Sequence, residues 1–198
     1  NQMLPRGILR EPLRHLKRAH TFLLTKVDQS EPAVYDTLKQ RLARYNPEAL
    51  VVESVHQPQY LVEIGRWQAN DLAATINLKE LQDRPVLAFS AIGNPASFER
   101  TIRDVGATVV EAVQFPDHHD YTLVEMQEIM QLAVEKGALA LITTEKDAVK
   151  IPKAFFNMPQ PLPLYVLVIE MTFLTGGDEL LTQIKNTIRR KQSLEVKA

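Results

Sequence analysis

Short apolar runs and amphipathic stretches follow one another along the whole chain. The apolar runs predict strands at residues 21–27, 49–55, 85–92, 107–115, 138–143 and 163–171. Stretches with apolar residues three and four positions apart predict helices at residues 12–20, 31–44, 93–106, 122–135, 144–150 and 178–191. Strands that alternate with helices indicate a parallel sheet with right-handed crossovers. We therefore expect an α/β fold: a Rossmann-like, open, mostly parallel sheet with helices on both faces.

Capping residues place some of the helix boundaries. Ser30 is expected to cap the second helix. Thr122 is followed three residues later by Glu125, which is the capping-box pattern, and Gly137 is expected to end the same helix. Residues 56–84 mix the helical and strand periods, and we expect one short strand or an insertion there.

The composition is that of an ordinary globular protein, and it excludes several kinds of site. With 198 residues, 45% hydrophobic and 24% charged, the chain is long enough to bury a substantial core. The absence of cysteine excludes disulfides, thiolate nucleophiles and cysteine-ligated zinc, and a cytosolic setting is the default. Charges interrupt the apolar runs before the ~18 residues of a membrane-spanning helix, and there is no secretory signal pattern, so we expect a soluble chain.

The charge distribution is uneven. Residues 1–20 carry five Lys/Arg and one Glu, and residues 185–198 carry the same numbers. Since the whole chain carries −1, its two ends of +4 leave −9 for the residues between them. Basic ends can contact phosphate or an acidic membrane surface, but they can equally be solvated helix faces. A nucleic-acid partner is not expected, because no basic stripe is interleaved with aromatic residues and the middle is acidic.

Three turns are expected where strands end, at the edge of an open α/β sheet where ligands gather. They are AIGNP at 91–95, FPDHHDY at 115–121 and TTEKD at 143–147. Gly93 in the first would let backbone amides approach an anion, but Asn94 and Pro95 also suit a plain turn. The chain contains neither GxxxxGKS/T nor GxGxxG, so we expect no ATP cradle within it.

The run FPDHHDYT places two histidines between two acids. The carboxylates of Asp117 and Asp120 lie within reach of His118 and His119. A carboxylate can orient an imidazole and raise its basicity, so this group suits a proton-handling role. Adjacent side chains in an extended segment point in opposite directions, and we therefore expect no metal site here. The alternative is a capped helix start with solvated histidines.

Two further stretches are open to more than one interpretation. In TTEKD a threonine can cap a short helix, and Lys146 can contact a phosphate or pair with Asp147. In LREP, Arg10 has the planar fork that suits phosphate, and Glu11 can hold a hydrated magnesium ion.

Four stretches together resemble one family in wording and order. The similarity to the carboxyl-terminal half of tetraacyldisaccharide 4′-kinase, the lipid A 4′-kinase of Gram-negative bacteria, is carried by LPRGILREPLRHLKRA, AFSAIGNPASFERTIRDVGATVV, FPDHHDYT and LITTEKDAVKIP. It is clear over residues 3–20 and 85–152, and vague over 28–84 and after 160. The resemblance implies a kinase that transfers the ATP γ-phosphate to the 4′-hydroxyl of a tetraacylated disaccharide 1-phosphate, with Mg²⁺ as cofactor.

The resemblance also implies residue roles and partners. Asp117 and His118 would be catalytic, with His118 supporting the base that receives the proton of the attacking hydroxyl, and His119 is the second choice. Arg10 and Glu11 would lie near the nucleotide and its metal ion, and no residue of this chain is assigned as a metal ligand. The enzyme would act as a peripheral protein at the cytoplasmic face of the bacterial inner membrane, where a basic amino end can contact anionic lipid.

The resemblance further predicts the domain organisation. Residues 1–20 would form a connector and basic helix at the junction with an amino-terminal P-loop lobe outside this sequence, and residues 21–198 would form the carboxyl-terminal α/β lobe. The other lobe would bind most of the ATP and Mg²⁺, so this chain alone would be an incomplete enzyme. The alternative is a stand-alone, non-catalytic α/β module that binds a nucleotide or an anion.

Overall fold

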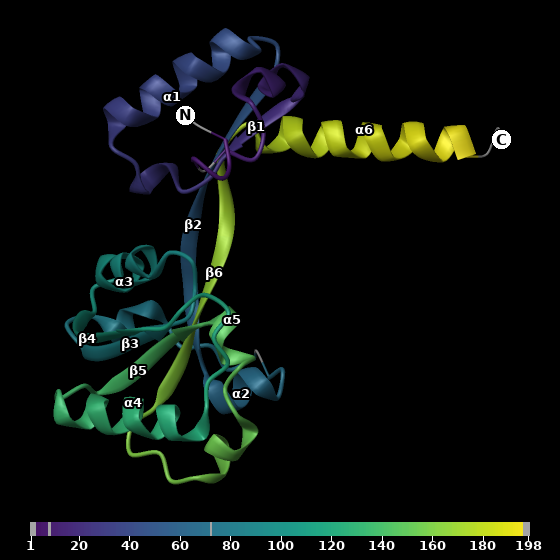
Figure 1. Ribbon diagram of the computed structural model, residues 1–198. Helices are drawn as coiled ribbons and strands as arrows, with labels where there is room; N and C mark the ends of the chain where they lie inside the picture. The colour runs from purple at the N-terminus through teal and green to yellow at the C-terminus, as the bar shows by residue number, and fades with distance from the viewer. Residues whose placement is uncertain (1–2, 8, 72, 196–198) are drawn as a thin grey trace. The chain divides into compact units, whose positions relative to one another are not determined.

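The computed structural model describes residues 3–7, 9–71 and 73–195. The chain divides into two compact units. Unit 1 comprises Asn1–His56 and Met171–Ala198, and unit 2 comprises Gln57–Glu170 (Figure 1). The boundary near residue 20 that the sequence suggests concerns a junction with residues outside this chain, and it stays a prediction.

A six-stranded sheet supplies strands to both units, in the order β1-β2-β6-β5-β3-β4. The pairs β1–β2, β6–β5, β5–β3 and β3–β4 are parallel. The strands are β1 (Thr21–Leu24), β2 (Leu50–Glu63), β3 (Pro85–Ser90), β4 (Thr108–Gln114), β5 (Ala140–Thr144) and β6 (Leu164–Thr175). The α-helices are α1 (Pro32–Tyr45), α2 (Ile64–Gln68), α3 (Pro95–Asp104), α4 (Leu123–Glu135), α5 (Glu145–Ala148) and α6 (Gly177–Glu195). The predicted α/β class with a mostly parallel sheet is confirmed.

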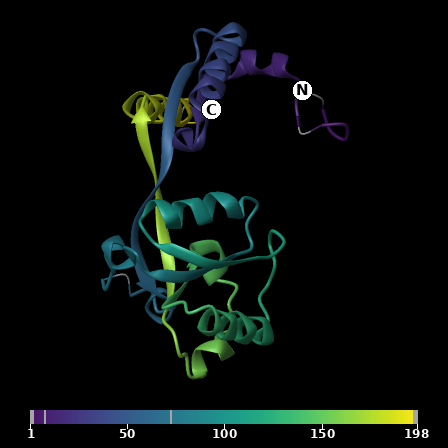
Figure 2. The same ribbon diagram turned by 90° about the vertical axis from the view of Figure 1, so that its left-hand side faces the viewer.

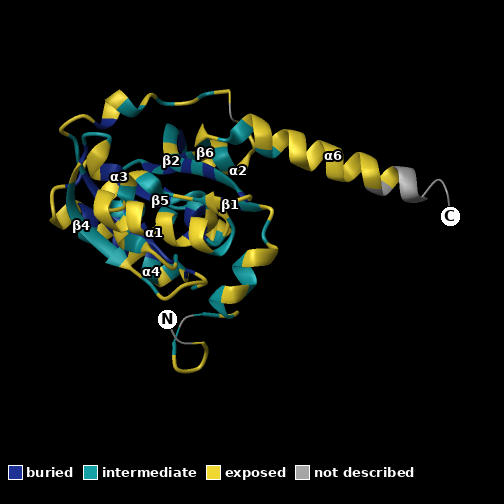
Figure 3. Ribbon diagram, turned by 90° about the horizontal axis from the view of Figure 1, so that it is seen from above, coloured by how far each residue is buried: buried dark blue, intermediate teal, exposed yellow. Residues whose placement is uncertain are grey.

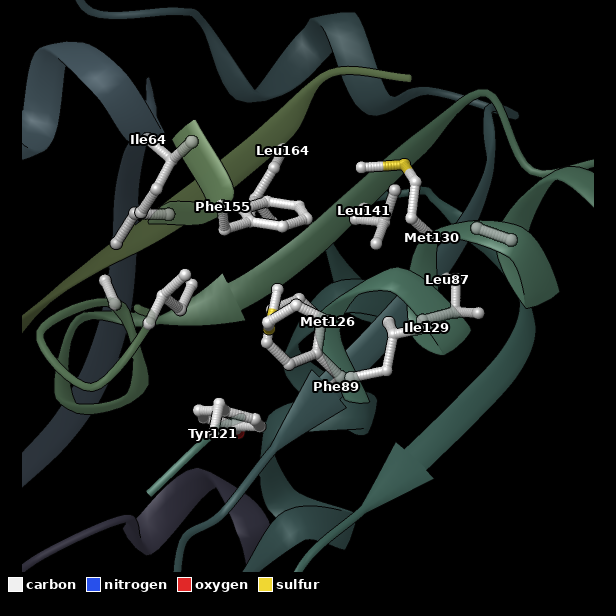
Figure 4. Close-up of a cluster of buried hydrophobic side chains, with 14 of the residues drawn as sticks. Ile64, Leu87, Phe89, Tyr121, Met126, Ile129, Met130, Leu141, Phe155 and Leu164 are labelled. Atoms are coloured by element: carbon white, nitrogen blue, oxygen red, sulfur yellow. The ribbon is translucent and has the colours of Figure 1, made fainter. Parts of the chain in front are cut away.

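Unit 2 is a sheet covered on both faces, with α3 on one side and α4 on the other (Figure 2). Successive residues of β3 point to opposite faces, as the period of a strand requires. Leu87 and Phe89 belong to the core cluster that includes α4 (Figure 4), whereas Val86 and Ala88 belong to the cluster that includes α3. Because β3 is buried on both faces, its sequence is the nearly continuous apolar run from which the strand was predicted.

Unit 1 has a smaller described core. Its buried cluster consists of Phe22 from β1, Leu42 from α1 and Ala49 just before β2. Helix α6 is exposed along its described side chains from residue 181 to residue 190 (Figure 3). The amphipathic pattern that predicted α1 and α6 therefore marks helices whose apolar faces are only partly covered by the described residues.

Two strands extend further than predicted. β2 continues to Glu63 rather than ending at residue 55, and it supplies the short strand expected within 56–84. β6 continues to Thr175 rather than ending at residue 171. In the β2 extension buried, half-buried and exposed residues follow one another irregularly, and in the β6 extension two half-buried residues precede two exposed ones, so neither segment has the clean period from which a strand is recognised.

The predicted cap at Ser30 is wrong. Ser30 follows the 3₁₀ turn Val27–Gln29, and the residue that precedes α1 is Glu31, whose side chain makes no capping hydrogen bond. Pro32 fixes the helix start, because its ring presets the helical φ and its missing N–H would be unpaired in the first turn anyway.

The other predicted boundaries fare better. The capping box between Thr122 and Glu125 is present at the start of α4, and Gly137 follows the helix with φ +70°. At the amino end, Pro12 precedes a helix as expected, but Leu13–Arg18 form a 3₁₀ helix rather than an α-helix.

Candidate active site

The candidate site lies at the carboxyl ends of β5, β3 and β4, which are neighbours in the sheet. Parallel neighbours end at the same edge, so the turns that follow them come together there. Two hydrogen bonds tie this edge: Phe115 N–H donates to the Ser90 carbonyl at 2.9 Å, and Thr143 Oγ1 donates to the Phe89 carbonyl at 3.1 Å. The prediction that the three turns lie at one edge is confirmed.

Ala91 connects all three turns through the two peptide groups that flank it. Its N–H donates to Asp147 Oδ1 at 3.1 Å, and its carbonyl accepts from His118 N–H at 3.3 Å. Ala91 is buried, so its N–H and its carbonyl depend on these partners for hydrogen bonding. The turn after β3 is thereby attached to the turns after β4 and β5 through one residue.

His118 points into solvent from a strained backbone. Its side chain is 89% exposed, and its φ is +67°, in the left-handed region that few non-glycine residues adopt. Asp117 Oδ2 lies 3.7 Å from His118 Nε2, which is an ion-pair distance when the imidazole is protonated but too long for a hydrogen bond. A Cβ added to Gly93 would lie 3.4 Å from the same Asp117 oxygen, so the carboxylate lies over the turn after β3.

His119 has a different environment from its neighbour. Its Nε2 lies 3.1 Å from both carboxylate oxygens of Glu125, and its ring stacks on Phe115 at 4.7 Å between centroids. Because a carboxylate only accepts hydrogen bonds, Nε2 carries the proton in this contact. Tyr121 packs edge-on against the same imidazole. The structure therefore engages His119 at the start of α4 and leaves the imidazole of His118 to solvent.

Glu125 holds the start of α4 together. It accepts from Thr122 N–H at 2.8 Å and from the Thr122 hydroxyl at 2.8 Å, in addition to its contact with His119. These donors, the Thr122 N–H first, hold the pKa of Glu125 below its usual value. The helix is capped by Thr122, while Asp120, the second acid of the loop, is exposed.

Asp147 is a site residue whose connections the sequence did not disclose. It is fully buried, and its Oδ2 accepts from Thr144 Oγ1 at 2.6 Å while Oδ1 accepts from Ala91. Lys146 is exposed, and no ion pair joins it to Asp147 among the described residues. The spacing Thr144-x-x-Asp147 is itself a capping pattern. It was the sequence signal that could have indicated that Asp147 contacts Thr144 rather than solvent.

Tyr121 extends the buried part of the site. Its ring packs edge-on against Phe89 and Phe115, and its hydroxyl is buried with no well-formed hydrogen bond to the described residues (Figure 4). Burial raises the pKa of Tyr121, and the negative charge of Asp147 raises it further. The phenol therefore stays protonated beneath the loop that carries the histidines.

Arg10 and Glu11 belong to unit 1, whereas Asp117 and His118 belong to unit 2. Arg10 is exposed. Glu11 Oε2 lies 2.9 Å from His15 Nδ1 and 2.6 Å from Arg18 NH2, and these partners, His15 first, lower the pKa of Glu11. The Glu11 carboxylate thus has cationic partners of its own, and its role near a nucleotide stays a prediction.

The described residues form neither a cluster of metal ligands nor a membrane-spanning helix. No group of three His, Asp or Glu side chains between residues 3 and 195, residues 8 and 72 aside, is placed to hold a metal ion. Within the same part of the chain, no helix is both long enough and apolar enough to span a bilayer.

The fold and the site define an α/β protein with an exposed imidazole and a neighbouring carboxylate at the carboxyl edge of a parallel sheet. The sequence profile of the family described as tetraacyldisaccharide-1-P 4′-kinase, LpxK, matches residues 1–189. The chain belongs to this family.

Relatives and a solved structure agree with the family. Tetraacyldisaccharide 4′-kinase of Halothermothrix orenii is 36% identical over 191 residues, which cover 93% of this chain and 49% of that protein. The enzyme of Anaeromyxobacter sp. strain Fw109-5 is 35% identical over 188 residues, covering 95% and 48%. The crystal structure of LpxK from Aquifex aeolicus in complex with ATP matches with a TM-score of 0.55 and 23% identity over 96% of this chain and 48% of that one, which supports the fold. The chain spans about half the length of the relatives it matches.

Proposed function

We propose that this chain is the carboxyl-terminal lobe of a kinase that transfers the γ-phosphate of ATP to the 4′-hydroxyl of tetraacyldisaccharide 1-phosphate in lipid A biosynthesis. The proposal is supported by membership of the tetraacyldisaccharide-1-P 4′-kinase family and by the ATP complex of the Aquifex aeolicus relative. ATP and Mg²⁺ would be bound mainly by a P-loop lobe outside this sequence. The chain alone would then be catalytically incomplete.

The observation that carries the proposal is the contrast between the two histidines of one loop. His119 is engaged by Glu125 and Phe115, whereas His118 is 89% exposed and has Asp117 beside it. An imidazole that a protein holds in a strained backbone and leaves to solvent can meet a group that is not part of this chain. That group would be the reacting hydroxyl or the base that receives its proton.

Phosphoryl transfer requires little covalent chemistry from the protein itself. Phosphoryl transfer depends on alignment of the attacking hydroxyl, on stabilisation of charge around the phosphate, and on a group that takes up the hydroxyl proton. We assign His118 to support a base on the other lobe in this proton transfer, and Asp117 to orient the imidazole. Bound Mg²⁺ would neutralise charge that develops on the transferred phosphate.

Arg10 and Glu11 are assigned to the nucleotide side of the site. The guanidinium of Arg10 suits bidentate contact with phosphate oxygens. Glu11 would have to exchange His15 and Arg18 for hydrated Mg²⁺, because those two side chains occupy its carboxylate in this structure. The basic amino-terminal segment would lie against anionic lipid head groups at the cytoplasmic face of the inner membrane, as a peripheral attachment.

The test is a kinase assay on a longer protein that contains both this chain and the proposed P-loop lobe. His118→Ala should lower kcat by about 10²-fold or more, as expected for loss of a proton-transfer group. His118→Asn is the second variant, because Asn tolerates a positive φ and so removes the imidazole without adding backbone strain. Thermal unfolding should change little for both variants, since the side chain is exposed.

His119→Ala is the matched comparison in the same loop. It should lower the midpoint of thermal unfolding more than His118→Ala does, because it removes the contact with Glu125. Full activity of both His118 variants would reject the assigned role of His118. A longer protein that binds ATP but transfers no phosphate to the acylated disaccharide would favour the non-catalytic binding module instead.

A further inference from the structure

The buried carboxylate of Asp147 lies two hydrogen bonds away from the backbone of His118. Asp147 Oδ1 accepts from the N–H of Ala91, and the carbonyl of Ala91 accepts from the N–H of His118. The two bonds are 3.1 and 3.3 Å long. Asp147 is therefore linked to the loop that carries His118 through the backbone of a single residue, Ala91.

The two oxygens of Asp147 do different things. Oδ2 accepts from the Thr144 hydroxyl, and the Asp147 N–H donates to the same hydroxyl, so Thr144 caps the short helix α5 and Oδ2 holds the capping hydroxyl. A cap needs nothing more. Oδ1 is directed away from α5 to Ala91, at the end of a neighbouring strand. This second contact has no role in the cap.

The cost of burying Asp147 also calls for a reason beyond local capping. The residue has no exposed surface, and removing an ionised carboxylate from water is expensive unless hydrogen bonds replace the water. The cap of α5 is already supplied by Thr144 and needs no charged residue at position 147. A charged acceptor makes shorter and stronger bonds than a neutral one, which is useful where a peptide group must be held in place.

The loop on the other side of Ala91 needs such a constraint. His118 has φ +67°, a conformation that costs an L-residue roughly 1–2 kcal/mol and persists only where neighbours fix it. The His118 N–H to Ala91 bond is a direct constraint on that backbone. The side chain itself is exposed and gains little support from packing.

We propose that Asp147 is a positioning residue: it fixes the backbone of Ala91, and through that residue the strained backbone from which His118 presents its imidazole to the reacting groups. The positioning of the loop stands on the structure, and its effect on turnover rests on the kinase function proposed above. Tyr121 contributes from below, because its buried ring packs on Phe89 and its protonated hydroxyl lies in the field of the Asp147 carboxylate.

The experiment compares three variants in the longer protein. Asp147→Ala should lower kcat by about 10- to 100-fold, because small displacements of a reacting group have effects of that size, while KM for ATP and for the acylated disaccharide stays within about twofold. Asp147→Asn should recover most of the activity, since its Oδ1 can still accept from Ala91 and its amide can donate to Thr144. Thr143→Val is the control: it removes the buried hydrogen bond from Thr143 on β5 to the Phe89 carbonyl on β3 but leaves both hydrogen bonds of Ala91 in place, and it should leave kcat within about twofold.

Hydrogen–deuterium exchange provides a readout that does not depend on activity. In Asp147→Ala the segments 88–92 and 115–122 should exchange faster than in wild type, and in Thr143→Val the 115–122 segment should not change. If Asp147→Ala fails to fold, Thr144→Val and Asp147→Asn separate the cap from the Ala91 contact, and only variants that loosen 115–122 should lose turnover.

The possible outcomes distinguish failure of the positioning role from failure of the proposed function. Unchanged exchange at 115–122, or a kcat loss in Asp147→Ala no greater than in Thr143→Val, would overturn the positioning role. A rise in KM with kcat intact would also overturn it, because that would indicate support of binding alone. A wild-type protein without kinase activity would reject the proposed function, and the exchange data would then still decide whether Asp147 holds the loop.

Discussion

In unit 2 the central strands β3 and β5 are buried on both faces, whereas the helices of unit 1 keep much of their apolar surface exposed. Leu87 and Leu141 have no exposed surface, while Leu38 in α1 and Leu181 in α6 are 41% and 46% exposed. The difference matters for the site. A loop that leaves the edge of a close-packed sheet is held to within small displacements, which suits a residue that must meet a reacting group.

The candidate site residues of the two units differ in the same way, in how firmly each is held. Asp117 and His118 leave the edge of the unit 2 sheet, and the backbone around them is tied to Ala91 and Ser90. Glu11 in unit 1 is held by exposed side chains, and exposed ion pairs contribute little stability. Unit 2 therefore fixes its candidate residues through backbone contacts and burial, and unit 1 fixes Glu11 by surface charge.

The largest expected difference in unfolding free energy between the units comes from truncating one leucine in each. Leu141→Ala in β5 should lower the free energy of unfolding by about 2–5 kcal/mol, because it removes buried surface and leaves a cavity. Leu38→Ala in α1 should change it by about 0.5 kcal/mol or less, since the side chain is largely solvated. Urea unfolding of both variants measures the difference, and equal losses would show that the exposed face of α1 is covered in solution.

The next effect separates backbone strain from steric contact. Gly176 in unit 1 and Gly137 in unit 2 have φ of +72° and +70°, but a Cβ at Gly176 would lie 2.9 Å from the Val51 carbonyl while one at Gly137 meets nothing within 4 Å. Each Gly→Ala change should cost roughly 1–2 kcal/mol for the backbone conformation. Gly176→Ala should lower the free energy of unfolding more than Gly137→Ala does. Equal losses in the two variants would mean that the backbone near Val51 shifts at little energetic cost to accommodate the added Cβ.

A smaller effect tests the start of α4. Thr122→Ala removes the side-chain cap and should lower the free energy of unfolding by about 1 kcal/mol. Thr122→Ser keeps the hydroxyl and serves as the control, because serine caps as well as threonine does. Loss of stability in both variants alike would assign the effect to the threonine methyl group rather than to the capping bond.

The smallest effect is a pH dependence in unit 1. Lys39 Nζ donates to Glu53 Oε1 at 2.7 Å, and this contact holds the pKa of Glu53 below its usual value. A carboxyl whose pKa is lower in the folded state stabilises the protein above the unfolded-state pKa, and that contribution is lost as the pH falls through the folded-state pKa. Glu53→Gln should therefore be less stable than wild type at pH 7, and the gap should narrow below pH about 4.5. Parallel stability curves for the two proteins from pH 7 to 3 would contradict this contribution of Glu53.

Much of the architecture was predictable because it depends on local patterns. The apolar run at β3 and the box formed by Thr122 and Glu125 each reflect a physical requirement met within a few residues. The prediction failed where the requirement came from elsewhere. β2 passes residue 55 because of its pairing in the sheet, and its mixed burial leaves no period to recognise.

The candidate site divides in the same way. The sequence identified FPDHHDYT and the sheet edge on which it lies, but it left His118 and His119 nearly equivalent. Only the fold distinguished them, since the partner of His119 lies six positions along the chain and its ring is stacked on Phe115. Asp147 was equally hidden, because the residue that its Oδ1 contacts lies 56 positions away.

The sequence by itself determined the α/β class, the family resemblance, and the three turns at one edge of the sheet, because strand order along the chain and short motifs encode them. The tertiary structure alone decided which imidazole faces solvent and that Asp147 is buried against Ala91. Burial and hydrogen bonding between distant residues are properties of the packed chain, and no window of sequence contains both partners.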